Sequence, residues 1–270
     1  MDRTRSIPDA CILSFSLIGG LLVLLTILAL ANLSVRELSD IPNLCRIATD
    51  SSVINSILLT MGAGFTSVLI LIFFGTPLGY ILARLKFKGK GIVEGIIDIP
   101  LMLPHTVAGI LVYLLFMDRG ILGAPLMSVG ISFEDAFPGI VVAMIFVSSP
   151  YYINSVREGI EQVPIHIENV ARTLGSTRFC AFRKVVLPLT YRHILNGSLL
   201  AWGRAIGEFA GVIMIAYYPM VISTLIYYRF TAMGFKEASA IAFVMILVCF
   251  VVFVIVRILT RYLGRYDDRV

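Results

Sequence analysis

The sequence predicts an all-α, polytopic membrane protein with six transmembrane helices and both termini on one side of the membrane. Hydrophobic residues make up 58% of the 270 residues and charged residues only 14%, and the mean hydropathy is +0.92. A soluble domain is about half apolar and about one quarter charged. The apolar residues also gather in six runs, and about 20 residues suffice for a helix to cross a bilayer. We treat residues 1–270 as a single transmembrane domain.

The predicted spans follow the apolar runs. They are residues 11–33, 53–83, 99–117, 137–156, 194–217 and 238–259. The first contains Ala29-Leu30-Ala31, which imitates a signal-peptidase site, so a cleaved signal peptide is the alternative. Because a signal's apolar core is only about 7–15 residues, we favour a retained span. Pro77 predicts a kink in the second span, and Pro100 and Pro104 interrupt the third.

Lysine and arginine are unevenly distributed between the spans. Six spans place both termini on one side, and the segments on that side hold 16 of the 22 Lys and Arg residues. They include Arg3 and Arg5 at the start, the turn 84–90, the segment 157–192 and the tail with Arg257, Arg261, Arg265 and Arg269. The positive-inside rule therefore predicts that both termini are cytoplasmic. No basic patch is interleaved with exposed aromatics, so we expect no nucleic-acid partner.

The segment 163–188, between the fourth and fifth spans, is the longest polar segment and carries helix signals. Pro164 suits the start of a short helix and Gly175 its C-terminal stop. The apolar positions at helical spacing are Val163, Ile167, Val170 and Leu174. A second short helix is predicted from Ser176, ended by Pro188. An ordered, amphipathic and basic loop is typical of a surface that presses against a partner.

Sequence motifs of catalysis and of metal binding are missing. There is no GxxxxGK[ST] for nucleotide binding, no HExxH and no GxSxG. His105, His166 and His193 fall in different segments, and we expect structural or solvated roles for them. The four cysteines form no CxxC pair, so neither a disulfide framework nor a zinc site is indicated. We predict a chain without catalytic residues, cofactor or metal.

The fifth predicted span contains an unusual polar pattern. Gly203, Gly207 and Gly211 recur every four residues, which predicts a flat stripe that another helix can approach closely, within one subunit or at a two-fold axis. Arg204 and Glu208 lie one turn apart on the same span. Charges at that depth pair with each other or face a water-filled pathway, and both readings stay open here.

Two stretches of the chain resemble a known family. Residues 168–175, ENVARTLG, followed after nine residues by Val185-Val186-Leu187-Pro188, resemble the EAA loop of permease subunits of ATP-binding-cassette importers. Two of the three EAA positions differ, because Asn169, Val170 and Ala171 stand there. Residues 203–209, GRAIGEF, and 212–219, VIMIAYYP, look like permeases for tetrahedral oxyanions of the molybdate and tungstate type. A sulfate or thiosulfate permease of the same class is the alternative.

The resemblance implies partners and site residues. It implies a homodimer of this chain in membrane lipid, bound to two cytoplasmic ATPase subunits and fed by an extracytoplasmic oxyanion-binding protein. The residues it implies for ATPase coupling are Ile165, His166, Glu168, Asn169, Ala171, Arg172, Thr173, Leu174 and Gly175. Those it implies for the translocation pathway or the dimer interface are Gly203, Arg204, Gly207, Glu208 and Gly211. We expect Glu168 and Arg172 at the ATPase surface.

A secondary transporter driven by an ion gradient is a different class. It predicts ion sites in broken helices and an internal inverted repeat. The sequence shows proline-interrupted spans but no convincing repeat, and an EAA-like loop has no purpose there. A channel or scaffold would show no coupling to ATP.

Overall fold

The computed structural model describes residues 10–264, and these form helices joined by turns and short irregular segments. The predicted all-α fold is confirmed for these residues. The basic residues predicted near the two ends, Arg3, Arg5, Arg265 and Arg269, lie outside the described residues, as do the side chains of Arg257 and Arg261.

The helices differ widely in length. In chain order they are α1 (Ala10–Leu38), α2 (Ile41–Ala48), α3 (Ser51–Arg84), α4 (Lys90–Met102), α5 (His105–Phe116), α6 (Gly123–Met127), α7 (Phe137–Gln162), α8 (Ile165–Thr173), α9 (Arg178–Ala181), the π-helical turn η1 (Phe182–Val186), α10 (Leu187–Ile206), α11 (Ala210–Ile215), α12 (Ile222–Met233) and α13 (Phe235–Gly264). Within the described part, α1, α3, α7 and α13 are long and apolar enough to cross a membrane, and α4 with α5 adds a fifth span if the bent pair counts as one.

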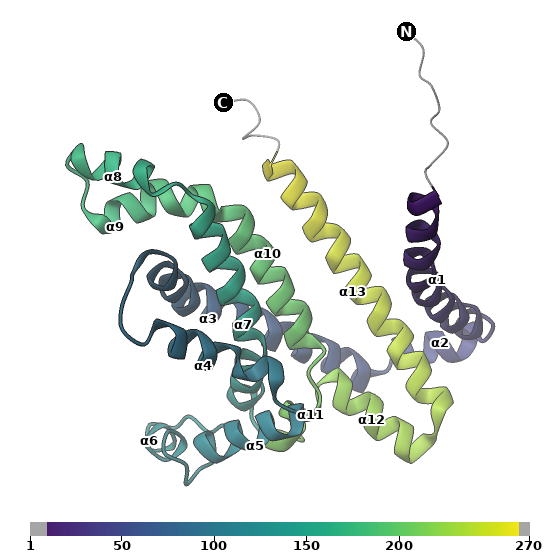
Figure 1. Cartoon of the computed structure of the whole chain (residues 1–270). Helices are drawn as coiled ribbons and strands as arrows, with labels where there is room; N and C mark the ends of the chain where they lie inside the picture. Colours follow the sequence, from purple (N-terminus) through teal and green to yellow (C-terminus); the bar gives the residue numbers. More distant parts are fainter. Residues whose placement is uncertain (1–9, 265–270) are drawn as a thin grey trace.

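The core is built from α3, α7 and α10, which pack most extensively against one another (Figure 1). Fully buried side chains along α7, among them Met144, Tyr152 and Val156, fill the space between these helices. Helix α1 lies at the periphery against α13 and α2, and its most apolar stretch is not buried at all. Such a helix, apolar on every side, is suited to lipid or to a second membrane subunit.

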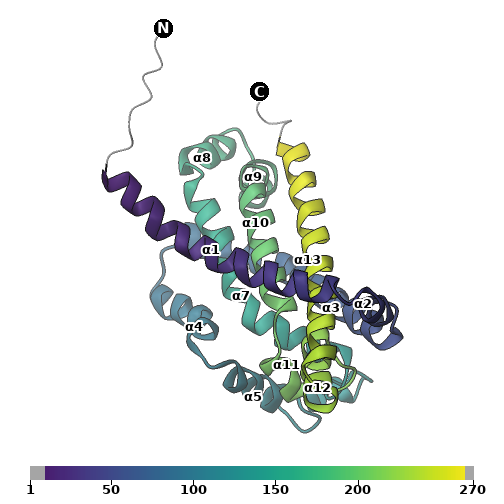
Figure 2. The ribbon, with the colours of Figure 1, turned by 90° about the vertical axis from the view of Figure 1, so that its right-hand side faces the viewer.

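The helix ends gather at two opposite ends of the molecule. Helices α8 and α9 lie at the same end as the start of α1 and the last turn of α13, whereas α2 and α12 lie at the other end (Figures 1 and 2). The short helix α8 therefore lies on the same side of the protein as the first turn of α1 and the last turn of α13.

Two predicted spans are not single helices. The third is bent by 117° between α4 and α5, because Pro104 forces the preceding Leu103 into an extended conformation. The fifth begins earlier than predicted, at Leu187, and its helix stops at Ile206 before α11 starts at Ala210. The prediction of one continuous helix over 194–217 is therefore wrong.

Pro188 does not end a helix as predicted. It occupies the first turn of α10, where a proline costs no hydrogen bond because the first amides of a helix have no partner in the helix. The turn η1 joins α9 to α10 without a break. The polar segment thus continues directly into the 20-residue helix α10.

Candidate functional site

The predicted short helix is present as α8, Ile165–Thr173. It ends as the sequence indicates: Gly175 adopts a left-handed φ of 92°, its amide donates to the Arg172 carbonyl, and the Ser176 amide donates to the Ala171 carbonyl. This pair of bonds is a Schellman motif, which satisfies the last carbonyls of the helix. The helix is therefore terminated by a defined cap and does not fray into the loop.

Glu168 fixes α8 to the body of the protein. Its side chain is 6% exposed and its Oε2 lies 3.2 Å from Nε of Arg84, at the last turn of α3. The Tyr80 hydroxyl donates a hydrogen bond to the other carboxylate oxygen. The expectation that the Glu168 side chain faces a partner is therefore wrong, because this carboxylate is buried and paired inside the chain.

The guanidinium of Arg84 joins three elements. Besides Glu168 it binds the carbonyl of Val163, the C-terminal cap of α7, with Nη2 to O at 2.8 Å. The ring of Tyr80 packs edge-on against Phe182 of η1, with centroids 4.8 Å apart. Helix α8 is thereby tied to α3, to the end of α7 and to the turn that leads into α10.

The outer surface of α8 and its flanks is apolar and exposed. Ile165 is 56% exposed, Val170 55%, Leu174 83% and Phe179 71%. The predicted apolar stripe is thus divided: Val163 is buried and Ile167 half-buried, whereas Val170 and Leu174 face outward. His166, Asn169, Arg172 and Thr173 are also exposed, and Ala171 is half-buried. Large apolar side chains are thus exposed here beside basic and polar ones, and we call Ile165, Val170, Leu174 and Phe179 the outer face of α8.

A second polar cluster forms where the two broken spans meet. Arg204 Nη2 in the last turn of α10 lies 2.6 Å from Oε2 of Glu208, which sits in the break before α11. The same Nη2 lies 2.8 Å from Nδ1 of His105, the first residue of α5. The predicted Arg204–Glu208 pair is present. Sequence reasoning missed His105, and only its position beside two prolines in a span hinted at a bend there.

Glu208 is the buried member of this cluster. It is 2% exposed, and its Oε1 accepts the amide of Gly211 at 2.7 Å, so it also starts the short helix α11. The Ser223 hydroxyl donates to the Glu208 carbonyl at 2.9 Å. Both carboxylate oxygens of Glu208 thus have a hydrogen-bond partner, one in Arg204 and the other in the Gly211 amide. The His105 side chain remains 53% exposed.

The predicted glycine stripe is interrupted. Gly207 caps α10 and Gly211 belongs to α11, so the two do not continue the helix face of Gly203. Instead, Gly211 meets Gly109 of α5, where a Cβ on Gly109 would lie 2.8 Å from the Gly211 Cα. The small residues thus allow the halves of two broken spans to touch.

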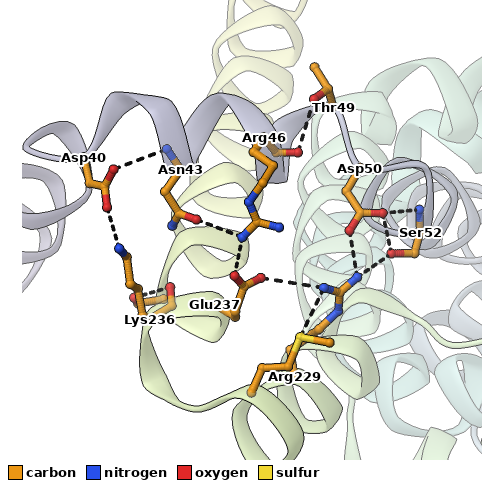
Figure 3. A network of polar contacts seen from close by, with 11 residues as sticks. Asp40, Asn43, Arg46, Thr49, Asp50, Ser52, Arg229, Lys236 and Glu237 are labelled. Atoms are coloured by element: carbon orange, nitrogen blue, oxygen red, sulfur yellow. Dashed lines mark hydrogen bonds and ion pairs between the residues drawn. The ribbon is translucent and has the colours of Figure 1, made fainter.

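At the end of the molecule opposite to α8, ion pairs join α2 and the start of α3 to α12 and α13 (Figure 3). Asp40 pairs with Lys236 at 2.7 Å and Asp50 with Arg229 at 2.7 Å. Arg46 pairs with Glu237, which also lies 3.6 Å from Arg229. We call this set of residues the corner network.

Comparison with known proteins places these features in context. A family model described as the inner membrane component of binding-protein-dependent transport systems matches residues 75–265. The molybdate/tungstate transport system permease protein WtpB of Pyrococcus furiosus is 36% identical over 257 residues, covering 95% of this chain and 96% of that protein. The sulfate transport system permease protein CysT of Salmonella typhimurium is 32% identical, covering 81% and 80%.

Solved structures share the fold. A bacterial ABC transporter involved in import of the acidic polysaccharide alginate superposes with a TM-score of 0.71 at 18% identity, covering 94% of this chain and 95% of that one. The same type of transporter in complex with a periplasmic protein bound to an alginate pentasaccharide gives a TM-score of 0.65 at 18% identity, covering 91% and 93%. At this identity the likeness shows the arrangement of helices.

Proposed function

This chain belongs to the family of inner membrane components of binding-protein-dependent transport systems, and we propose that it is the membrane subunit of an ATP-driven importer for molybdate or tungstate. The observation that carries the proposal is its similarity, over nearly the whole chain, to permeases named for these two anions. The chain itself is then a transport subunit, and partner subunits hydrolyse ATP.

The proposed topology has six crossings with cytoplasmic termini. The bent pair α4–α5 supplies the third crossing, and α10 with α11 supplies the fifth. The positive-inside distribution supports this orientation, and so does the position of α8 at the end to which α1 and α13 point (Figures 1 and 2). The cell membrane is the expected location.

We propose that α8 is the coupling helix, seated in a groove of the ATPase. Its outer face supplies the contact, with Ile165, Val170 and Leu174 as apolar anchors and Arg172 at the rim. Two ATPase subunits would close on ATP binding and move two copies of α8. Because α8 is tied to α3 and α7 through Arg84 and Glu168, its displacement would reach the spans directly.

A homodimer completes the proposed pathway. The stretch 203–211, with Gly203, Arg204, Gly207, Glu208 and Gly211, is proposed to line the translocation pathway or the interface with the second copy. Broken helices within a membrane are tolerated where the freed backbone groups are buried in protein or line a water-filled cavity. Two such breaks meet here, which supports a pathway at this position.

Docking of the extracytoplasmic binding protein is proposed at the end opposite to α8. Of the three polar segments expected there, 34–52 and 218–236 contribute charges that the corner network already pairs internally. The third segment, 118–135, presents exposed apolar side chains such as Ile121 and Val129, at 82% and 70%. We therefore favour this segment as the main contact.

A sulfate permease of the same class is the second candidate, supported by the similarity to CysT proteins. Selectivity is expected to reside mainly in the binding protein, so the two candidates differ in which loaded partner activates the complex.

The test is to purify the chain with its co-expressed ATPase subunits and reconstitute it in lipid. Binding protein loaded with tungstate should stimulate ATP hydrolysis and drive uptake of tungstate into vesicles. Stimulation by sulfate-loaded protein alone would move the assignment to sulfate. Absence of a copurifying ATPase would overturn the importer proposal.

A further inference from the structure

We propose that Arg204 and His105 form a transient binding site for the transported tetrahedral oxyanion, at the place where the two broken spans meet. The inference rests on the proposed function and adds a ligand and a residue, His105, to the pathway. It starts from the convergence of two nitrogen-rich side chains from α10 and α5, 99 positions apart in sequence, with 2.8 Å between Arg204 Nη2 and His105 Nδ1.

The free donors of Arg204 point to an acceptor-rich ligand. Its Nη2 is used by Glu208 and His105, whereas Nη1 and Nε make no hydrogen bond to any residue in the range that the structure describes. Nη1 and Nε lie on different edges of the planar guanidinium, so each can donate a hydrogen bond of its own. A tetrahedral oxyanion offers acceptors only, and either of these unused donors can bind one of its oxygens.

The protonation of His105 follows from its partner. Nδ1 and Nε2 of His105 lie 2.8 and 3.3 Å from Arg204 Nη2, and Nδ1 also lies 3.5 Å from Glu208 Oε2. A guanidinium has no acceptor, so the ring nitrogen that pairs with it carries no proton in the neutral ring, and the other ring nitrogen is the donor. Since 53% of this side chain is exposed, the ring can turn this donor toward a ligand on its open side.

Glu208 sets the strength of the site. It is buried at 2% exposure and held by both Arg204 and the Gly211 amide. Its negative charge offsets that of Arg204, so an anion bound to Arg204 meets little net positive charge. Transport requires sites that are weak enough to release their cargo, and a compensated arginine meets this requirement.

Two glycines leave room beside Arg204. A Cβ built on Gly203 would have no neighbouring atom within 4 Å, and one on Gly207 would meet only backbone oxygens at 3.6 Å or more. The space next to Arg204 is therefore open on its own helix. The start of α5 at His105 adds amides without a side-chain cap, which favour negative charge.

Protection from chemical labelling tests the site. In a cysteine-free background, Gly203→Cys in the full permease–ATPase complex is modified with a negatively charged methanethiosulfonate reagent, with and without millimolar tungstate. We expect tungstate to slow modification several-fold. Protection should be lost in His105→Ala and in the charge-neutral pair Arg204→Gln with Glu208→Gln, which leaves no unpaired buried charge. The matched control pair, Arg229→Gln with Asp50→Asn, removes an ion pair of the corner network and should keep the protection.

Transport gives the second readout. His105→Ala should lower tungstate uptake at least about tenfold, the factor that corresponds to one lost hydrogen bond to a charged group, whereas the control pair Arg229→Gln with Asp50→Asn should keep uptake within about twofold. A labelling rate that does not respond to tungstate, or protection that survives both site variants, would show a purely structural ion pair and overturn the site. If loaded binding protein fails to stimulate ATP hydrolysis at all, the proposed function fails instead.

Discussion

The guanidinium of Arg84 lies 3.2 Å from the carboxylate of Glu168, and both side chains are almost fully buried, at 9% and 6% exposure. One residue ends the long helix α3 and the other sits in the middle of the short helix α8. A buried ion pair is weak evidence for stability, but breaking one partner leaves an uncompensated buried charge. The pair therefore makes α8 and the end of α3 move together.

Removing one charge of this pair should uncouple transport from ATP hydrolysis. For Glu168→Gln we expect a destabilisation of about 3 kcal/mol and fewer anions transported per ATP, because Arg84 is left buried without a counter-charge. The double variant Arg84→Gln with Glu168→Gln should recover part of the stability. The number of anions per ATP in proteoliposomes measures coupling, and Glu161→Gln, an exposed carboxylate on α7, is the control. Unchanged coupling in Glu168→Gln would contradict the prediction.

The outer face of α8 should control ATPase docking without affecting the fold. Leu174→Asp places a charge on a side chain that is 83% exposed, so thermal stability of the permease should change by less than about 0.5 kcal/mol. The ATPase should no longer copurify, because a charge would be buried in the apolar contact. Phe87→Asp, on the neighbouring turn and 41% exposed, should leave copurification intact. Equal loss in both variants would place the docking surface elsewhere.

Gly175 tests whether the cap of α8 is needed. Its φ of 92° is unfavourable for residues with a Cβ, so Gly175→Val should cost about 1–2 kcal/mol or distort the end of α8. Gly175→Asn, which tolerates this region better, should be milder. Hydrogen exchange of the Gly175 and Ser176 amides, which close the cap, reports the distortion directly. Protected amides in the valine variant would refute this account.

Close approach of the broken spans should make Gly109 intolerant of any side chain. A Cβ there would lie 2.8–2.9 Å from Gly211 backbone atoms, so even Gly109→Ala should lower the melting temperature and the uptake rate together. Gly62→Ala in α3, whose Cβ meets nothing within 4 Å, is the matched control. Melting curves of the two purified variants decide between them.

The corner network should lose stability only in acid. Hydrogen bonds from Ser52 and from Arg229 hold the pKa of Asp50 below its usual value, and a hydrogen bond with Lys236 does the same for the pKa of Asp40. A depressed carboxyl pKa gives stabilisation that is complete above the unfolded value of about 3.9 and is lost as the pH falls through the folded value. We expect Asp50→Asn to lower the melting temperature at pH 7 and to have little effect near pH 3. A constant difference over this range would contradict it.

The sequence by itself determined the class of protein and the position of the short helix α8. Apolar runs can be counted without a structure because burial in lipid demands about 20 such residues in succession. The boundaries of α8 follow from Pro164 and Gly175, since caps are local chemistry. The family could also be inferred, because the loop pattern and residues 203–219 are short continuous motifs.

Only the tertiary structure decided where charged side chains point. The family resemblance led us to expect Glu168 at the ATPase surface, but its inward direction depends on Tyr80 and Arg84, more than eighty residues earlier. The same holds for His105. Its partner Arg204 lies near it because the helices of two predicted spans are interrupted, one between α4 and α5 and the other between α10 and α11. A break at Gly207–Phe209 is not encoded by a proline, so the continuous glycine spacing was misleading. Contacts between distant segments depend on how the spans pack, and periodicity within one segment carries no information about that.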